Sequence, residues 1–206
     1  MVVTTFQTRW DTFMRRIVNY IGQDQWEMGT VYGLLSDLRP RVFVEIGVEF
    51  GGSFYVYAGL CAPGATVVSI DLGNRKKSKR RVRQTVRLLR SEGFDARRIW
   101  GDSQCPETLE KLTSALAGRK IDLLHIDGDH SVPGFYLDWV DYTALMARGG
   151  AVIVGDVFCR QGKMEVFRLW PGLRRGHRTI EIVNRELHKV RTRKLPPEVG
   201  IGIIWL

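Results

Sequence analysis

The sequence has few cysteines and no long apolar run. Its three cysteines, Cys61, Cys105 and Cys159, lie far from one another along the chain. An odd number without C-x-x-C spacing argues against both a disulfide framework and a structural zinc site. No stretch of 18 apolar residues is present, which argues against a membrane-spanning helix. Charged side chains near the start leave no apolar signal-peptide core. We therefore expect a reducing, cytoplasmic compartment.

Acidic residues are missing from one segment. Between Arg75 and Arg90, nine side chains are basic and none is acidic. The whole chain has 31 basic and 22 acidic residues, an excess of nine, so its basicity is local. On a helix, one face would hold Lys76, Arg80, Arg83, Arg87 and Arg90. Two interpretations stay open: a solvated helix face, and a surface that follows the phosphates of an RNA.

Short apolar runs alternate with helical segments along the chain. Apolar runs predict strands at 42–46, 67–71, 99–100, 121–127 and 151–156, with two further strands at 179–183 and 201–206. Helical spacing predicts helices within 10–38, 53–60, 78–91, 106–116 and 135–146. This alternation predicts a doubly wound α/β domain over 40–206. Residues 1–39 are expected to form an N-terminal helical lid.

Each of the first five predicted strands has a carboxylate at or near its end. These acids are Glu45, Asp71, Asp102, Asp127 and Asp156. A single one could simply cap a helix. Successive acids are separated by the length of one strand–helix unit, so all five would meet at one edge of a parallel sheet, where ligands bind. The pattern predicts a cleft for hydroxyls, amines or a cation.

The first strand runs into a glycine-rich loop, 45–53. Asp71 ends the next predicted strand after Gly47, and an acid there can accept both hydroxyls of a ribose. The dinucleotide fingerprint would need glycine where Glu49 stands, and a glutamate would repel a pyrophosphate. The phosphate-binding motif G-x-x-x-x-G-K-[ST] is absent as well. A ribose ligand without phosphates at this point is favoured, and S-adenosylmethionine fits.

Five motifs between residues 40 and 160 resemble those of class I S-adenosylmethionine-dependent methyltransferases. They are V-E-I-G-V-E-F-G-G-S, S-I-D-L, G-D-S, H-I-D-G-D-H-S and G-G-A-V-I-V-G-D-V. The segment His125 to Ser131 is similar to the branch that contains cephalosporin-hydroxylase-like, macrocin-type and sugar O-methyltransferases. The resemblance implies a Rossmann-like, mostly parallel sheet of seven strands whose last two form an antiparallel hairpin.

The resemblance also implies which residues contact S-adenosylmethionine. Gly47 and its neighbours would border the methionine part, Asp71 would hold the ribose, and Asp102 with Ser103 would lie beside the adenine. The full set expected to bind the cofactor is Glu45, Gly47, Glu49, Gly51, Ser53, Asp71, Asp102, Ser103 and Asp127.

A magnesium site is a further implication of the resemblance. Relatives hold the ion with an acid after the fourth strand, matched by Asp127, and an adjacent pair after the fifth, of which Asp156 matches one. The other position of the pair is Gly155 or Val157, and neither has a side-chain oxygen. Because magnesium keeps several waters, Asp127 and Asp156 with Asp129 or His130 could suffice.

The expected chemistry is methyl transfer to a hydroxyl. His130 follows the acids in a turn and would act as general base beside Asp127, because the unperturbed pKa of histidine is near 6.5. The N/D-P-P-Y/F loop of amino-directed nucleic-acid methylases is absent. The expected partner is a small polar, sugar-containing acceptor, with weak or no nucleic-acid binding, no membrane, and a homo-oligomer left open. The alternatives are an RNA methyltransferase that uses the basic helix at 75–90 and a non-catalytic cofactor- or RNA-binding module.

Overall fold

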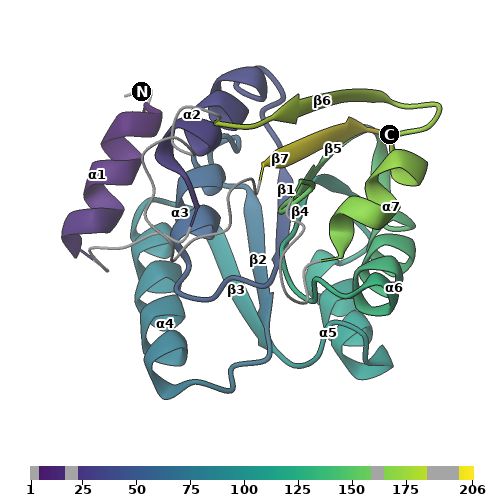
Figure 1. Ribbon diagram of the computed structural model, residues 1–206. Helices are drawn as coiled ribbons and strands as arrows, with labels where there is room; N and C mark the ends of the chain where they lie inside the picture. The colour runs from purple at the N-terminus through teal and green to yellow at the C-terminus, as the bar shows by residue number, and fades with distance from the viewer. Residues whose placement is uncertain (1–4, 17–22, 159–164, 185–199) are drawn as a thin grey trace.

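The computed structural model describes residues 5–16, 23–158, 165–184 and 200–206 of the chain. A central sheet separates two layers of helices (Figure 1). Its strand order is β3-β2-β1-β4-β5-β7-β6. The strands are β1 (Val42–Ile46), β2 (Thr66–Asp71), β3 (Asp95–Trp100), β4 (Ile121–Ile126), β5 (Met146–Val154), β6 (Arg178–Ile182) and β7 (Ile201–Trp205). Only β7 runs against its neighbours β5 and β6, so the predicted mostly parallel sheet with an antiparallel C-terminal pair is confirmed.

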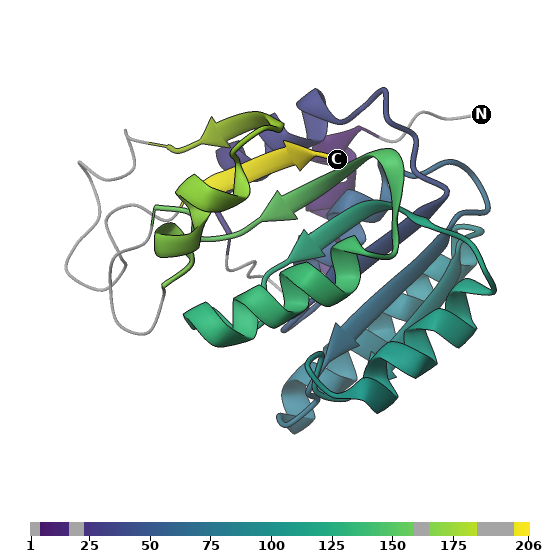
Figure 2. The ribbon, with the colours of Figure 1, turned by 90° about the vertical axis from the view of Figure 1, so that its right-hand side faces the viewer.

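The two faces of the sheet pack against different helices (Figure 2). One core joins the sheet to α1 (Phe6–Arg16), α2 (Gln25–Leu34), α3 (Gly52–Ala58) and α4 (Lys76–Ser91). The other joins it to α5 (Pro106–Leu116), α6 (Val132–Thr143) and α7 (Val166–Leu173). On β1, Phe43 contributes to the first core and Val44 to the second. Strands buried on both faces explain the unbroken apolar runs in the sequence.

Several predicted boundaries differ from the observed ones. The helical run expected over 10–38 contains two helices, and residues 17–22 lie outside the described part of the chain. The helix expected to end at residue 146 ends at Thr143, because Met146 already pairs with Ile121 in the sheet. β3 is longer than predicted, because an edge strand tolerates the exposed charges that interrupt its apolar pattern. α7 was not predicted, since Pro171 inside it interrupts the helical signal.

The N-terminal helix α1 packs on the same core as the sheet. Phe13 is fully buried and its ring stacks on Tyr55 of α3 with the centroids 6.0 Å apart. The buried guanidinium of Arg9 donates to the Tyr55 carbonyl at 2.9 Å and pairs with Glu92 at 2.9 Å. The division into a lid over 1–39 and a domain over 40–206 stays a prediction. Within the described ranges, no helix has the length and apolar character needed to cross a membrane.

Candidate active site

A cleft opens at the carboxyl ends of the parallel strands. The strand order reverses between β1 and β4, and open α/β sheets bind ligands at such a reversal. The cleft has a volume of about 460 Å³ and is lined by the loops that follow β1, β2, β3 and β4. Among the predicted cofactor residues, those that line it are Gly47, Glu49, Asp71, Asp102, Ser103 and Asp127. The cleft is large enough for a nucleoside-sized ligand.

The loop after β1 approaches the end of β4 closely at Gly47. Gly47 has a φ of +80°, and a Cβ atom there would lie 2.1 Å from the carbonyl oxygen of Asp127. Both the left-handed backbone and the close approach therefore require glycine. The contact brings the first loop and the acid after β4 to one side of the cleft.

Backbone amides orient the carboxylate of Asp71 at the end of β2. The amide of Gly73 donates to Asp71 Oδ1 at 2.7 Å, and the amide of Glu49 donates to Oδ2 at 3.2 Å. Glu49 itself is exposed and has a left-handed φ of 42°. Its side chain forms a 3.7 Å ion pair with Arg75. The geometry presents a fixed carboxylate to the cleft, as ribose recognition needs.

Three predicted cofactor residues, Glu45, Gly51 and Ser53, do not line the cleft. Glu45 is fully buried, accepts a hydrogen bond from the hydroxyl of Ser53, and lies 3.3 Å from His125 Nδ1. Burial favours the neutral form of His125 and so lowers its pKa. The nearby carboxylates, chiefly Glu45, have the larger combined effect, so the pKa of His125 is raised above its ordinary value. Gly51 begins α3 with a φ of 82°. These three residues belong to the segment 45–53 but do not face the cleft.

The loop after β3 forms another wall of the cleft. The amide of Gln104 donates to Asp102 Oδ1 at 3.0 Å, and the Tyr142 hydroxyl donates to the Ser103 carbonyl at 2.9 Å. The side chain of Gln104 reaches Asp129 Oδ2 at 3.3 Å and also lines the cleft. Gln104 was not predicted as a site residue, although its place directly after G-D-S is a usable signal.

Asp138 of α6 is a second residue near the site that was not predicted from the sequence. It is fully buried, and neither of its carboxylate oxygens has a hydrogen-bond partner within the described residues. One oxygen lies behind Gly128, where a Cβ atom would approach it to 3.4 Å. Burial raises the pKa of Asp138 to about 7. An unpaired buried carboxylate has no signature in a helical sequence pattern.

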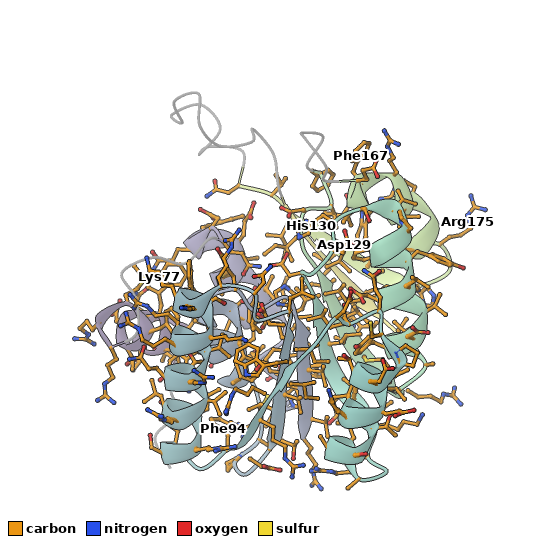
Figure 3. The ribbon with its side chains drawn as sticks, turned by 90° about the horizontal axis from the view of Figure 1, so that it is seen from below. Lys77, Phe94, Asp129, His130, Phe167 and Arg175 are labelled. Atoms are coloured by element: carbon orange, nitrogen blue, oxygen red, sulfur yellow. The ribbon has the colours of Figure 1, made fainter. Side chains whose placement is uncertain are left out.

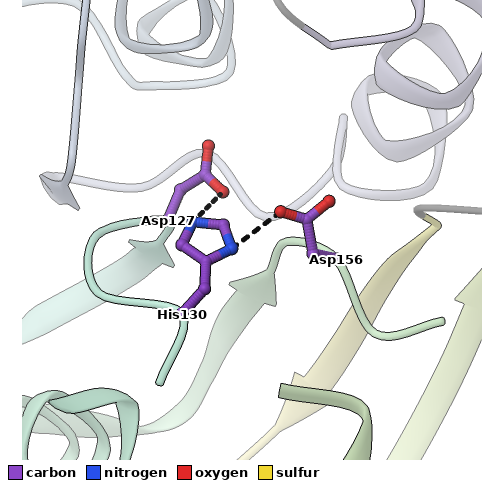
Figure 4. Close-up of side chains that lie close together, drawn as sticks. All are labelled: Asp127, His130 and Asp156. Atoms are coloured by element: carbon purple, nitrogen blue, oxygen red, sulfur yellow. Dashed lines mark ion pairs between the residues drawn. The ribbon is translucent and has the colours of Figure 1, made fainter. Parts of the chain in front are cut away.

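Asp127, His130 and Asp156 come together beside the cleft (Figure 4). Asp127 follows β4, Asp156 follows β5, and His130 lies in the turn before α6. His130 Nδ1 is 2.8 Å from Asp156 Oδ2, and its Nε2 is 3.7 Å from Asp127 Oδ1. One ligand atom from each of the three residues lies within 4.8 Å of the other two. We call this group the Asp-His-Asp cluster.

The charges of the Asp-His-Asp cluster depend on one another. Burial lowers the pKa of His130, but Asp156 and Asp127 more than offset this and raise it to about 9. Burial raises the pKa of Asp127 to about 6, against the opposing effect of His125 and His130. His130 is therefore protonated at neutral pH in this arrangement. The prediction of a general base assumed the ordinary histidine pKa near 6.5, and the pKa of His130 lies above that value.

The glycine at position 155 makes room for Asp127. A Cβ atom on Gly155 would lie 2.3 Å from Asp127 Oδ1, so no larger residue fits without moving that carboxylate. The adjacent pair of ligands expected from relatives is thus reduced to Asp156, and His130 supplies the third donor of the cluster. The side-chain Nε2 of Gln23, which precedes α2, donates to Asp127 Oδ2 at 2.9 Å.

Residues 44–157 match the sequence pattern of a family described as "Methyltransferase domain". The matched segment is more than half of the 206-residue chain. The chain belongs to the methyltransferase-domain family. The resemblance to class I S-adenosylmethionine-dependent methyltransferases is thereby confirmed. No curated protein gives a significant match to this methyltransferase.

Solved structures share the fold of this methyltransferase at low sequence identity. An O-methyltransferase from Bacillus cereus in complex with SAH is 14% identical, with 92% of this chain and 84% of that chain covered at a TM-score of 0.64. TomG from Streptomyces achromogenes, an O-methyltransferase in complex with SAM, is 13% identical over 98% and 88% of the two chains, with a TM-score of 0.65. An rRNA methylase from Streptococcus thermophilus is 11% identical over 91% and 99%, with a TM-score of 0.58. The shared fold therefore does not decide between small-molecule and RNA acceptors.

Proposed function

We propose that this methyltransferase transfers the methyl group of S-adenosylmethionine to a hydroxyl of a small polar, sugar-containing acceptor. The observation on which this rests is the position of the Asp-His-Asp cluster next to the cleft. Two carboxylates and an imidazole suit the binding and deprotonation of a hydroxyl, because they can accept its proton or hold a cation beside it. Two of the structural neighbours are O-methyltransferases as well.

The donor set of the cluster fits a divalent cation such as magnesium. Asp127 and Asp156 offer carboxylate oxygens, the ligands that magnesium prefers. His130 Nδ1 lies 2.8 Å from Asp156 Oδ2, so the protonated imidazole forms an ion pair with this carboxylate. A cation bound between the two carboxylates would take over the charge balance that the imidazolium of His130 provides here. Bound magnesium would favour the alkoxide form of an acceptor hydroxyl.

The residues of the chain have distinct roles in this proposal. Asp71 and the loop at Gly47 hold the donor, while Asp127 and Asp156 orient the acceptor. Methyl transfer from a sulfonium is an in-line displacement: the acceptor oxygen bonds to the methyl carbon as the carbon–sulfur bond breaks, and the sulfide leaves. Correct placement of donor and acceptor supplies much of the barrier reduction. Asp127 and Asp156 raise the pKa of His130. A bound cation that balanced their charge would lower this pKa again and leave the imidazole neutral, the form that can accept the hydroxyl proton.

Transfer of labelled methyl groups to a panel of sugar-containing acceptors tests this function. We expect activity with hydroxylated acceptors and S-adenosylhomocysteine as the second product. His130→Gln should lose turnover and retain the affinity for S-adenosylhomocysteine, whereas Gln7→Ala, an exposed substitution on α1, should change neither. Methyl transfer to amines or to RNA alone would contradict the proposed acceptor class.

We also propose a reducing, cytoplasmic setting. Cys61 and Cys105 are free thiols, and Cys105 is exposed. An exposed free thiol is compatible with a compartment in which thiols stay reduced. Localisation of a tagged full-length chain would test this setting.

A further inference from the structure

The helix α4 presents two contrasting faces. Val82, Val86 and Leu89 are buried against the sheet and form part of its core. The opposite face is exposed and consists of Lys76, Arg80, Arg83, Arg87 and Arg90. We call these five residues the α4 basic face. Since the apolar side already attaches the helix to the sheet, packing does not explain the cations.

The charge of the α4 basic face has little compensation within the protein. In the segment 75–90, the one ion pair among the described residues joins Arg75 to Glu49, and Arg75 is not part of the face. Arg90 uses its Nε to donate to the Ala96 carbonyl, which brings no negative charge. Like charges three or four residues apart destabilise a helix, and cations in its first turn oppose the helix dipole. The face is therefore unfavourable for the isolated protein and favourable beside a polyanion.

The dimensions of the face match a nucleic-acid strand. From Lys76 to Arg90 the helix rises about 21 Å, and its cations follow one another every 5 Å or so. Successive phosphates along a strand have a comparable spacing. A small phosphorylated molecule would span only part of this line, and one bound in the cleft would not reach its far end.

A lipid surface fits the face less well. Helices that lie on membranes insert an apolar side into the bilayer, and the apolar side of α4 is buried in the core. Of the large apolar side chains that are exposed in the described ranges, none belongs to α4. The face thus offers charge without an inserting group.

The start of α4 also forms part of the cleft. Arg75 and Ser78 line it, and Lys77 marks this end of the helix in Figure 3. We propose that the α4 basic face is a docking surface for RNA, which binds it through its phosphates and independently of base sequence. A strand that lies along α4 would have one end at the mouth of the cleft. This docking is separate from the proposed methyl transfer to a small acceptor.

Fluorescence anisotropy with a labelled single-stranded oligouridine tests the docking surface. The wild type should bind with an affinity that falls steeply between about 50 and 200 mM salt. Arg83→Glu/Arg87→Glu should weaken binding about tenfold or more and flatten the log–log salt dependence by about 1.4, since each phosphate contact contributes about 0.7. Neither residue lines the cleft.

Arg148→Glu/Arg175→Glu is the matched control. Both arginines are exposed, the change in net charge is identical, and Arg175 lies across the molecule from Lys77 (Figure 3). The control should keep its RNA affinity within about twofold, because phosphate contacts act over short range in salt. Affinity for S-adenosylhomocysteine and the thermal melt verify that each variant is folded. If the charge reversal unfolds the protein, Arg83→Gln/Arg87→Gln should still reduce the affinity.

Three results would overturn the docking surface. They are the absence of oligouridine binding by the wild type at low salt, an equal loss in the control, and capture by phosphatidylserine vesicles without binding of RNA. Methyl transfer to small acceptors, measured on the same preparations, reports on the proposed function separately. Absence of that activity in the wild type, with its RNA binding intact, would refute the function and leave the docking surface standing.

Discussion

His130 and Asp156 contact each other across the carboxyl edge of the sheet, with Nδ1 and Oδ2 2.8 Å apart. Asp156 adopts a left-handed backbone conformation with a φ of 58°, which is strained for a residue other than glycine. Its carboxylate contacts a histidine from a different loop. Such strain persists only where the surrounding structure enforces it, and it is concentrated at functional sites.

The first prediction concerns the metal. If Asp127 and Asp156 hold magnesium as proposed, EDTA should abolish methyl transfer and added magnesium should restore it. Asp156→Asn should lower turnover about 100-fold or more at a fixed magnesium concentration. Asp141→Asn, outside the Asp-His-Asp cluster, serves as the control and should be fully active. Turnover that is indifferent to EDTA would show that the two acids act without a metal.

The second prediction concerns cofactor affinity. Asp71→Ala should weaken S-adenosylhomocysteine binding by about 1–3 kcal/mol, because it removes charge-assisted hydrogen bonds to the ribose. Isothermal calorimetry measures this change directly. Glu110→Ala, on the exposed side of α5, should bind like the wild type. Tight binding of NAD, with none of S-adenosylhomocysteine, would contradict the assignment of the cleft.

The third prediction separates steric contact from backbone conformation at Gly47. Gly47 and Gly118 share a φ of +80°, but a Cβ atom on Gly118 would meet nothing within 4 Å. Gly118→Ala should therefore cost only the left-handed penalty, about 1–2 kcal/mol of unfolding free energy. Gly47→Ala should cost about 3 kcal/mol or more and impair cofactor binding, since its Cβ would collide with the Asp127 carbonyl. Urea unfolding of the two variants should show this difference, and equal costs would count against the close approach.

The fourth prediction concerns the pH dependence of stability. Burial raises the pKa of Asp138 to about 7, so the folded protein keeps this proton at pH values where the unfolded chain has lost it. The contribution of Asp138 to stability is thus full at acidic pH and is lost as the pH rises to about 7. Asp138→Asn removes this loss. Its free energy of unfolding relative to the wild type should increase by about 2–3 kcal/mol from pH 5 to pH 8.

Asp95→Asn is the control for the pH experiment. Hydrogen bonds from Arg97 hold the pKa of Asp95 below its usual range, so its carboxylate is ionised in both states above about pH 5. The difference in unfolding free energy between this variant and the wild type should therefore stay constant from pH 5 to pH 8. A similar constant difference for Asp138→Asn would show that the Asp138 carboxylate does not change its protonation in this range.

Much of the sheet could be predicted from local patterns. A strand buried on both faces needs consecutive apolar residues. The observed ranges of β1, β2 and β4 agree closely with the apolar runs in the sequence. β3 and α7 were harder, because one is an edge strand with exposed charges and the other contains a proline. Local patterns are weakest where the tertiary environment, such as the edge of a sheet, relaxes the requirement for apolar residues.

The sequence by itself determined the class of the site. Parallel strands bring their carboxyl ends to one edge, so acids spaced one strand–helix unit apart must come near one another, as Asp71, Asp102 and Asp127 do. The tertiary structure decided how these groups behave. Gly155 leaves room for Asp127, the packing of α6 buries Asp138 without a partner, and two acids from different loops raise the pKa of His130. These properties depend on distances between residues far apart in the chain, because burial and Coulomb interactions act through space and not along the sequence.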